Sequence, residues 1–292
     1  MRDHFINELV ERAKKNKKIF LIVGDLGYNV VEPFAENFPD RFLNIGIAEQ
    51  NMMGVAAGIA SEGMHVFVYS IANFPTFRCA EQIRNDVDYH KLPVTIVSIG
   101  GGFSYGNLGY SHHAIQDYGL MRLMPNTLIC APGDLSETSK ILNYILKYPQ
   151  PSYLRLDKSF NEIIRSETFS LSPGKWICFK KIKSKKTFLT TGNTLKFYKE
   201  INRLKKYSNF NIYSLPIWGQ SYKKNQSKML RNFDHIITIE DHLLDGGFGS
   251  WIRESIGGNT KIRIENLGLN NKHLSSVGSQ EFLNKKSGLF IV

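Results

Sequence analysis

Short apolar segments alternate with amphipathic helical segments through the first 160 residues of the chain. The segment KIFLIVG (18–24) follows a helical segment, FINELVERAKK (5–15), and LPVTIVSIG (92–100) is apolar almost throughout. Such a continuous apolar strand is typical of a parallel sheet that is buried on both faces. Repeated strand–helix–strand units therefore predict a doubly wound α/β fold, with ligands beyond the carboxyl ends of the strands. Further strands are expected at 42–47, 64–70, 127–132 and 151–156, and further helices at 48–63, 74–90, 114–124 and 134–147.

A polar, basic segment that contains SLSPG interrupts this alternation after residue 156. Clusters of Ser, Pro and Gly between periodic segments are typical of linkers. The alternation then resumes, with strands expected at 188–192, 210–216, 235–241 and 261–266 and helices at 194–206 and 247–257. Because 292 residues suit two domains, we predict two doubly wound α/β domains with mainly parallel sheets. We place them at residues 1–160 and 187–292, joined by a linker at 161–186.

The net charge of +11 arises in the second part of the chain. Residues 1–172 carry 16 Lys and Arg against 18 Asp and Glu, whereas residues 173–292 carry 21 against 8. Basic patches can bind phosphate backbones, but a run such as KKIKSKK (180–186) is more often a solvated surface. The sequence has no zinc-finger spacing and no aromatic RNA-binding signature, so we expect no nucleic-acid partner.

Composition and cysteine content limit the class of protein further. With 42% hydrophobic residues, the chain is expected to be globular. No segment approaches the roughly 18 consecutive apolar residues of a membrane span, and the first residues do not resemble a secretory signal. Cys79, Cys130 and Cys178 lie far apart without a CxxC pair, which argues against disulfides and a cysteine-based zinc site. These features favour a cytoplasmic protein that does not act at a membrane.

The segment NIGIAEQNMMGVAAGIASEG (44–63) places a carboxylate, Glu49, where a helix rich in Ala and Gly begins. Small residues allow another backbone to approach closely, and the amino end of a helix stabilises an anion. Alternatively, Glu49 is an ordinary acidic residue in a first helical turn. Taken alone, this segment leaves both interpretations open.

Four segments together resemble the pyrimidine-binding domain of transketolases and of 1-deoxy-xylulose-5-phosphate synthase. They are FPDRFLNIGIAEQNMMGVAAGIASEG, YHKLPVTIVSIGGGFSYG, LGYSHHAIQD and LMRLMPNTLICAPGD, and they cover most of residues 20–157. Residues 187–292, with ITIEDHLLDGGFGSWIRESI, are similar to the C-terminal domain of that family. The ordered series of segments is far more specific than any one of them.

The resemblance implies a thiamine diphosphate-dependent enzyme that transfers a two-carbon ketol unit between sugars. In the family, a glutamate at the position of Glu49 hydrogen-bonds the aminopyrimidine of the cofactor and promotes loss of the proton at C2. This role suits a buried carboxyl group, which can share a proton with a ring nitrogen. Transketolases surround the aminopyrimidine with aromatic residues, so Phe74 and Phe77 are expected to bind it by stacking. Packing in the core is the alternative, chiefly for Phe77.

The loop between strand 92–100 and helix 114–124 carries two adjacent histidines, His112 and His113. The THQ motif of the family places a substrate-contacting histidine at the position of His112, and imidazole can exchange a proton with a sugar hydroxyl near neutral pH. We expect His112 to be catalytic and both histidines to bind substrate. Many transketolases carry an aspartate four residues earlier to bind a donor hydroxyl, whereas this chain has Leu108. The donor sugar is therefore left open, an unusual or nucleotide-linked sugar being one alternative.

Three further residues are candidate ligands of substrate or cofactor. Arg78 resembles an arginine of the synthase branch, and we expect it to contact substrate or to pair with a helix carboxylate. Arg155 stands where the family often binds a sugar phosphate, which a guanidinium suits, and a structural salt bridge is the alternative. Asp25, in GDLG, is a candidate for positioning the cofactor. No residue of the chain is predicted to bind a metal, since the two adjacent histidines have no acidic ligand set around them.

Full-length members of the family bind the cofactor diphosphate through Mg²⁺ in a separate N-terminal domain. This chain has GDL at 24–26 but lacks the Asn-rich continuation that supplies the metal ligands. The active site of the family lies between the diphosphate domain of one subunit and the pyrimidine domain of another, so the resemblance implies half a site. We expect a separately encoded diphosphate-binding subunit that holds Mg²⁺ and forms an α2β2 heterotetramer with this chain.

Two other enzyme classes share this layout: the β component of a 2-oxo acid dehydrogenase, and a synthase-like enzyme that condenses pyruvate with an aldose. GIAEQNM and the SHH segment favour a transketolase. Outside the enzymes, the alternative is an inactive scaffold that has kept the fold. The joint presence of Glu49, Phe74 and His112 argues against that alternative.

Overall fold

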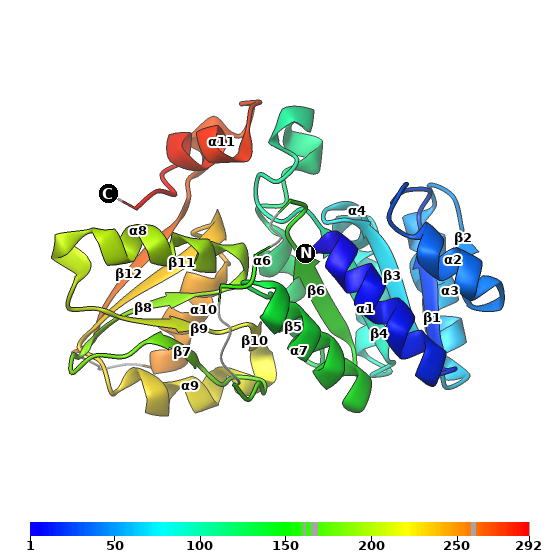
Figure 1. Cartoon of the computed structure of the whole chain (residues 1–292), viewed down its shortest axis with the longest axis horizontal. Coiled ribbons are helices and arrows are strands. Elements are labelled where there is room, and N and C mark those ends of the chain that lie inside the picture. Colours follow the sequence, from blue (N-terminus) through cyan, green and yellow to red (C-terminus); the bar gives the residue numbers. More distant parts are fainter. Residues whose placement is uncertain (160–161, 165–168, 258–260, 292) are drawn as a thin grey trace.

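A computed structural model describes residues 1–159, 162–164, 169–257 and 261–291 of the chain. It has two α/β units, each built around a sheet whose strands are mainly parallel, and the units lie side by side (Figure 1). The predicted fold class is therefore confirmed.

Among the described residues, the first sheet has seven strands in the order β10-β5-β6-β4-β3-β1-β2, of which β10 (Ile217–Trp218) comes from the second half of the chain. All residues of the central strands β4 and β6 are buried, as expected for parallel strands that helices cover on both faces. The strands of the first unit are β1 (Ile19–Val23), β2 (Phe42–Asn44), β3 (His65–Ile71), β4 (Val94–Ile99), β5 (Leu128–Cys130) and β6 (Ser152–Leu156).

Helices cover both faces of this sheet (Figure 1). The apolar side chains of α1 (Arg2–Lys15) and α7 (Leu135–Lys147) pack into one core cluster, and those of α3 (Glu49–Ser61) pack into another. The sheet thus forms the middle layer of a three-layer unit. The shorter helices are α2 (Glu32–Asn37), α4 (Phe74–Phe77), α5 (Ala80–Gln82) and α6 (Asp117–Met121).

In the part of the chain that the structure describes, the second sheet has five strands in the order β12-β11-β8-β9-β7. Its strands are β7 (Ile177–Lys180), β8 (Lys186–Thr190), β9 (Asn211–Ser214), β11 (His235–Leu243) and β12 (Arg263–Leu269). Side chains of α9 and α10 join one apolar cluster and those of α8 and α11 join another, so this sheet is also covered on both faces. These helices are α8 (Tyr198–Arg203), α9 (Lys223–Leu230), α10 (Phe248–Ile256) and α11 (Gln280–Lys286).

Two strands differ from the expected division of the chain. β7 lies within the segment 161–186, which we expected to be a linker, and it pairs antiparallel with β9. β10 (Ile217–Trp218) follows β9 in the chain but pairs antiparallel with β5, so the second half of the chain contributes an edge strand to the first sheet. The domain boundaries remain a prediction, and part of the expected linker, 160–161 and 165–168, lies outside the described residues.

The helix expected over residues 74–90 is interrupted. It consists of α4, α5 and a π-helical turn, Ile83–Asp88. Cys79 has φ −112° and ψ 14°, which breaks the helical path between α4 and α5. π-Helical turns occur frequently at functional sites, and this one follows the segment with the predicted aromatic residues. Across the described ranges, each helix is too short or too polar to cross a bilayer.

Candidate active site

Glu49 is the first residue of α3, and its side chain is only 3% exposed. The chain reaches it from β2 through a turn in which Gly46 has φ +75°, a left-handed conformation that favours glycine. β2 pairs with β1 in parallel, so this turn leaves the carboxyl edge of the sheet. Glu49 therefore lies where open α/β sheets bind their ligands.

Four side chains form a continuous series of contacts, which we call the Glu49 cluster: Glu49, Arg78, Phe74 and His112. Arg78 Nη1 donates a hydrogen bond to Glu49 Oε2 at 2.9 Å. The guanidinium of Arg78 lies over the Phe74 ring, with its Cζ 4.4 Å from the ring centroid. The Phe74 and His112 rings meet edge to face with their centroids 5.2 Å apart. The fold thus gathers four of the predicted site residues from three separate segments.

Asn73 fixes the backbone on both sides of His112. Its Nδ2 donates to His113 O at 2.8 Å and to Ser111 O at 3.3 Å. Because Asn73 directly precedes α4, it ties the histidine loop to the helix that carries Phe74. Partial burial, and then the positive charge of Arg78, lower the pKa of His112. A neutral imidazole that can accept a proton is therefore favoured at this position near pH 7.

His113 is fully buried within the loop and does not join the contacts around Glu49. Its ring packs edge to face on Phe103, with the centroids 4.9 Å apart, and its Nε2 lies 3.3 Å from Gly106 O. Burial lowers the pKa of His113, which favours the neutral ring. The predicted contact of His113 with substrate remains a prediction, and this placement favours a packing role instead.

Two other predicted site residues, Phe77 and Asp25, and the loop residue Leu108 make none of the contacts described above. Phe77 is 49% exposed and is available to a ligand or to a partner chain. Asp25 accepts a hydrogen bond from Asn44 Nδ2 at 3.1 Å, which places it beside the turn that leads to Glu49. Leu108 is 56% exposed and lies in the histidine loop.

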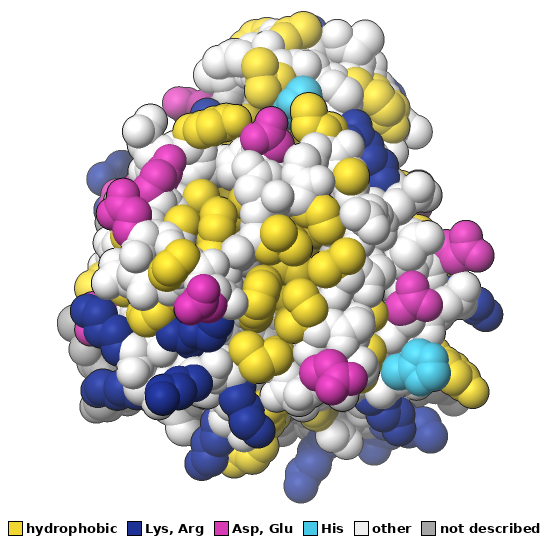
Figure 2. Space-filling view, turned by 90° about the vertical axis from the view of Figure 1, so that its right-hand side faces the viewer, with side chains coloured by type: hydrophobic (Ala, Val, Ile, Leu, Met, Phe, Trp, Pro, Cys, Tyr) yellow, Lys and Arg dark blue, Asp and Glu magenta, His cyan; other side chains and the backbone are white. Residues whose placement is uncertain are grey.

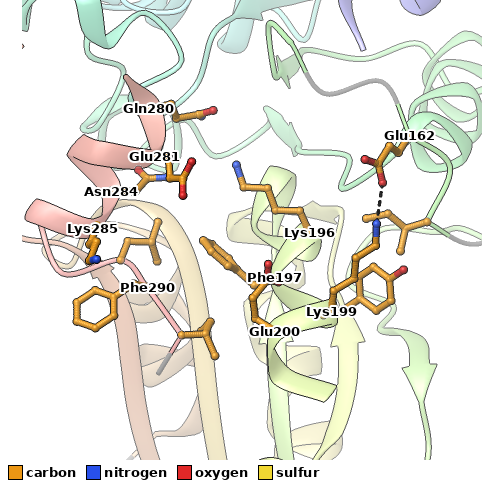
Figure 3. Close-up of a pocket in the computed structure, with 14 residues that line it drawn as sticks. Glu162, Lys196, Phe197, Lys199, Glu200, Gln280, Glu281, Asn284, Lys285 and Phe290 are labelled. Atoms are coloured by element: carbon orange, nitrogen blue, oxygen red, sulfur yellow. Dashed lines mark hydrogen bonds and ion pairs between the residues drawn. The ribbon is translucent and has the colours of Figure 1, made fainter. Parts of the chain in front are cut away.

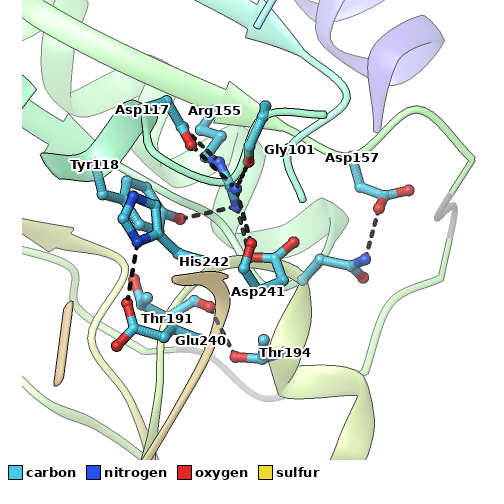
Figure 4. A network of polar contacts seen from close by, with 12 residues as sticks. Gly101, Asp117, Tyr118, Arg155, Asp157, Thr191, Thr194, Glu240, Asp241 and His242 are labelled. Atoms are coloured by element: carbon cyan, nitrogen blue, oxygen red, sulfur yellow. Dashed lines mark hydrogen bonds and ion pairs between the residues drawn. The ribbon is translucent and has the colours of Figure 1, made fainter. Parts of the chain in front are cut away.

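Arg155 is buried between the two units, and its side chain is 3% exposed (Figure 4). Its Nε donates to Asp117 Oδ2 at 2.7 Å and its Nη1 donates to Asp241 Oδ1 at 2.6 Å. Of the two roles that the sequence left open, these contacts favour the structural salt bridge over phosphate binding. Sequence reasoning missed Asp117 and Asp241 as its partners. The available signal for Asp241 was its place, beside Glu240, directly after the largely apolar segment IITI (236–239).

A pocket of about 600 Å³ lies elsewhere, next to α8 and α11 of the second unit (Figure 3). Lysines and glutamates line it in equal number, and Lys199 pairs with Glu162 at 3.2 Å. Because the two charges balance, the lining favours neither an anionic nor a cationic ligand. The pocket includes none of the predicted site residues. A site that is completed by a partner need not enclose a volume in one chain, so we take the Glu49 cluster as the candidate active site. The charged residues of the pocket are Glu162, Lys196, Lys199, Glu200, Glu281 and Lys285.

Comparison with known proteins relates the whole chain to transketolases. Residues 1–161 match the transketolase pyrimidine-binding domain. A protein of Methanocaldococcus jannaschii, named as a transketolase C-terminal section, is 33% identical over 97% of this chain and 90% of its own length. A subunit of the apulose-4-phosphate transketolase of Actinobacillus succinogenes is 29% identical over 98% of this chain and 94% of its own length. The 1-deoxy-D-xylulose-5-phosphate synthase of Aquifex aeolicus is 31% identical over 98% of this chain, which spans 46% of that enzyme.

Solved structures agree with this relation. One that is described as a split gene transketolase, in an inactive beta4 tetramer, has a TM-score of 0.87 and 30% identity. The match covers 99% of this chain and 94% of that one. Transketolase from Campylobacter jejuni shares the fold, with a TM-score of 0.82 at 19% identity, over 99% of this chain and 45% of that chain. The chain therefore belongs to the thiamine diphosphate-dependent transketolase family and is similar, over nearly its whole length, to relatives that are named as a C-terminal section or as one subunit of a transketolase.

Proposed function

We propose that this chain is the pyrimidine-binding subunit of a heteromeric transketolase, which transfers a two-carbon ketol unit between sugars. The observation that carries this proposal is the buried carboxylate of Glu49 at the carboxyl edge of the first sheet. Burying a charge is costly unless the charge is paired, and the partner of Glu49, Arg78, is itself half exposed. A ligand that hydrogen-bonds Glu49 explains why a carboxylate is buried here although its ionic partner is half exposed.

The side chains around Glu49 suit an aminopyrimidine. The carboxylate can hold a proton shared with a ring nitrogen, and the Phe74 ring offers a surface for stacking. His112, whose lowered pKa favours the neutral ring, can accept a proton from a sugar hydroxyl. Thiamine diphosphate, when bound, supplies the electron sink for cleaving a bond next to a carbonyl group. In the described ranges no three His, Cys, Asp or Glu side chains are grouped to hold a metal ion, so we assign the Mg²⁺ ligands to a partner.

Two observations support a partner subunit. Two relatives that this chain matches over at least 90% of their own length are named as a C-terminal section or as one subunit of a transketolase. Apolar side chains also gather in the centre of the face that lies on the right of Figure 1, with charged groups around them (Figure 2). Exposed apolar patches of this kind commonly mark protein interfaces. We propose an α2β2 heterotetramer, and we expect this chain alone to associate with itself in an inactive form, as described for the split gene transketolase.

Hydrogen–deuterium exchange at C2 of the bound cofactor tests the role of Glu49. In the assembled complex, Glu49→Ala and Glu49→Gln should slow this exchange by about 10²- to 10⁴-fold, because the proton on the aminopyrimidine loses its partner. Glu62→Ala is the matched control, since Glu62 is an exposed acidic residue next to the other end of α3. A wild-type exchange rate in Glu49→Ala would refute the proposal.

A synthase-like condensation is the second candidate, favoured by the match to the Aquifex aeolicus enzyme. CO₂ distinguishes the two reactions. Condensing pyruvate with an aldose releases CO₂, whereas ketol transfer does not. The complex should therefore be supplied with pyruvate and an aldose phosphate, and separately with a ketose and an aldose. Release of the pyruvate carboxyl carbon as CO₂ only when the aldose phosphate is present would identify a synthase, and release without the aldose would point to a 2-oxo acid decarboxylating component. Exchange of carbon between ketose and aldose would identify a transketolase.

A further inference from the structure

The carboxyl edge of the second sheet has the topology of a ligand crevice. The chain runs from β8 to β9 on one side and then crosses to β11 on the other side, so the strand order reverses between β8 and β11. In open α/β sheets, ligands bind outside the carboxyl ends of the strands at such a switch point. Here the crevice lies beyond Thr190 and Ile239, the last pair in the register of these two strands.

Arg155 of the first unit fills this crevice (Figure 4). It extends from β6, and its guanidinium donates to the Asp241 side chain at 2.6 Å and to the Asp241 carbonyl at 3.2 Å. The space left between Arg155, Asp157, Asn193 and Asp241 is about 10 Å³, which holds one water at most. The place of a ligand is thus taken by a side chain of the same protein.

The same guanidinium holds the loop that carries His112. Arg155 Nη2 donates to Ala114 O at 2.8 Å. Ala114 also pairs with Gly102 through two backbone hydrogen bonds, 2.8 and 3.0 Å long, which close the loop at its base. A Cβ atom on Gly102 would lie 2.7 Å from Asp241 Oδ2, so the loop packs directly on the ion pair. The position of the loop is therefore coupled to Arg155 and Asp241.

The second unit holds this loop at further points. Leu243, at the end of β11, donates its N–H to Ile115 O at 2.9 Å. Gln280, at the start of α11, donates to Ser104 Oγ at 3.1 Å. Both contacts come from the unit that contains Asp241. The buried Arg155–Asp241 ion pair is therefore one of several contacts by which the second unit holds the loop.

We propose that Arg155 and Asp241 are positioning residues, which couple the second unit to the loop that presents His112. The inference rests on the proposed function, in which His112 contacts the sugar, and it assigns a role to the second unit. Arg155 occupies the crevice in which a ligand of that unit would bind, and it orders the histidine loop through Ala114 O. Misplacing a substrate-binding group by about 1 Å can cost up to 100-fold in rate, so the coupling bears on catalysis.

The test compares two conservative test variants of the full chain with one control variant. Asp241→Asn keeps the shape and one acceptor oxygen, and Asp117 still balances the charge of Arg155, so the variant is expected to fold. Glu254→Gln is the matched control, because Glu254 also forms ion pairs between the units, with Arg122, but lies outside the loop. Arg155→Lys is a second test variant, since one ammonium group cannot replace a guanidinium that bonds several groups at once.

Hydrogen exchange of the 103–113 amides, followed by mass spectrometry, should be roughly tenfold faster in Asp241→Asn and in Arg155→Lys than in Glu254→Gln. In the complex, the KM for the sugar donor should rise by about tenfold in both test variants, while cofactor affinity and exchange at C2 stay at the wild-type level. Equal loop exchange in all three variants, or an unchanged KM, would overturn the inference. A wild-type complex without exchange at C2 would instead refute the proposed function, while the loop measurement would still decide whether Arg155 and Asp241 hold the loop.

Discussion

In our proposal, Glu49 serves to bind the cofactor and does not stabilise the fold. Its ionic partner, Arg78, is half exposed, so solvent screens the pair from that side and the pair contributes little to the free energy of unfolding, even though Glu49 itself is buried. Glu49→Gln should therefore change that free energy by no more than about 1 kcal/mol, as urea denaturation of the full chain would show. A loss of several kcal/mol would mean that Glu49 holds the fold together, and slower exchange at C2 would then need another explanation.

His65 should make the stability of the chain depend on pH. It lies 4% exposed at the start of β3, and burial lowers its pKa to about 4. In the unfolded chain a histidine titrates near pH 6.5, so between pH 6.5 and 4 the unfolded state binds a proton that the folded state does not. The contribution of His65 to the free energy of unfolding is therefore complete above pH 6.5 and falls by about 3 kcal/mol as the pH drops to 4.

The matched variant for this prediction is His65→Gln. Glutamine does not titrate and can keep a hydrogen bond to Thr95 Oγ1, which lies 2.8 Å from His65 Nε2. Urea denaturation at pH 7 and at pH 4.5 should show a smaller loss of stability in the variant than in the wild type. The same loss in both proteins would contradict the assignment to His65.

Local motifs were enough to single out candidate site residues, whose roles remain predictions. Glu49, Phe74 and His112 each stand in a recognisable segment, and the fold brings them into contact. No local sequence pattern predicts the contacts of Arg155, because Asp117 and Asp241 lie 38 and 86 residues away in the chain. Asn73 was missed for the same reason, since it acts on the backbone of a distant loop.

At the scale of elements, α7 offers a direct test of how a local sequence signal sets the start of a helix. Asp134 precedes this helix, and its Oδ1 accepts a hydrogen bond from Glu137 N at 2.7 Å. Asp134→Ala should lower the free energy of unfolding by about 1 to 2 kcal/mol, because the helix loses its cap. Asp134→Asn keeps the acceptor for Glu137 N but loses the oxygen that accepts from Ile164 N at 3.0 Å, so it should cost less than Asp134→Ala. Equal stability of the two variants in urea denaturation would contradict a capping role.

The buried parallel strands were the elements that the sequence predicted best. β1, β3, β4 and β11 lie within about two residues of their expected bounds, because long apolar segments are distinctive. β7 and β10 were not expected, since β7 lies in a polar segment and β10 is two residues long. Each is stabilised by a partner strand that is distant in the chain, β9 for β7 and β5 for β10, which local periodicity does not reveal.

At the scale of the whole molecule, the site is open on the side of Glu49. Ile47, in the turn that leads to Glu49, is 75% exposed, and Phe77 is 49% exposed. Exposed apolar side chains beside a buried carboxylate suit a surface that another chain covers. In this account the chain supplies the residues that bind the aminopyrimidine and a partner supplies the residues that bind the diphosphate.

Calorimetric binding of thiamine diphosphate and Mg²⁺ distinguishes a half-site from a complete site. It should be measured on this chain alone, on a separately encoded diphosphate-binding transketolase subunit from the same organism, and on the two purified together. We expect tight binding by the pair and none by this chain alone, because in our proposal each chain holds half of the site. Tight binding by this chain alone would contradict the half-site, and an absence of binding by the pair would contradict the assignment of the cofactor.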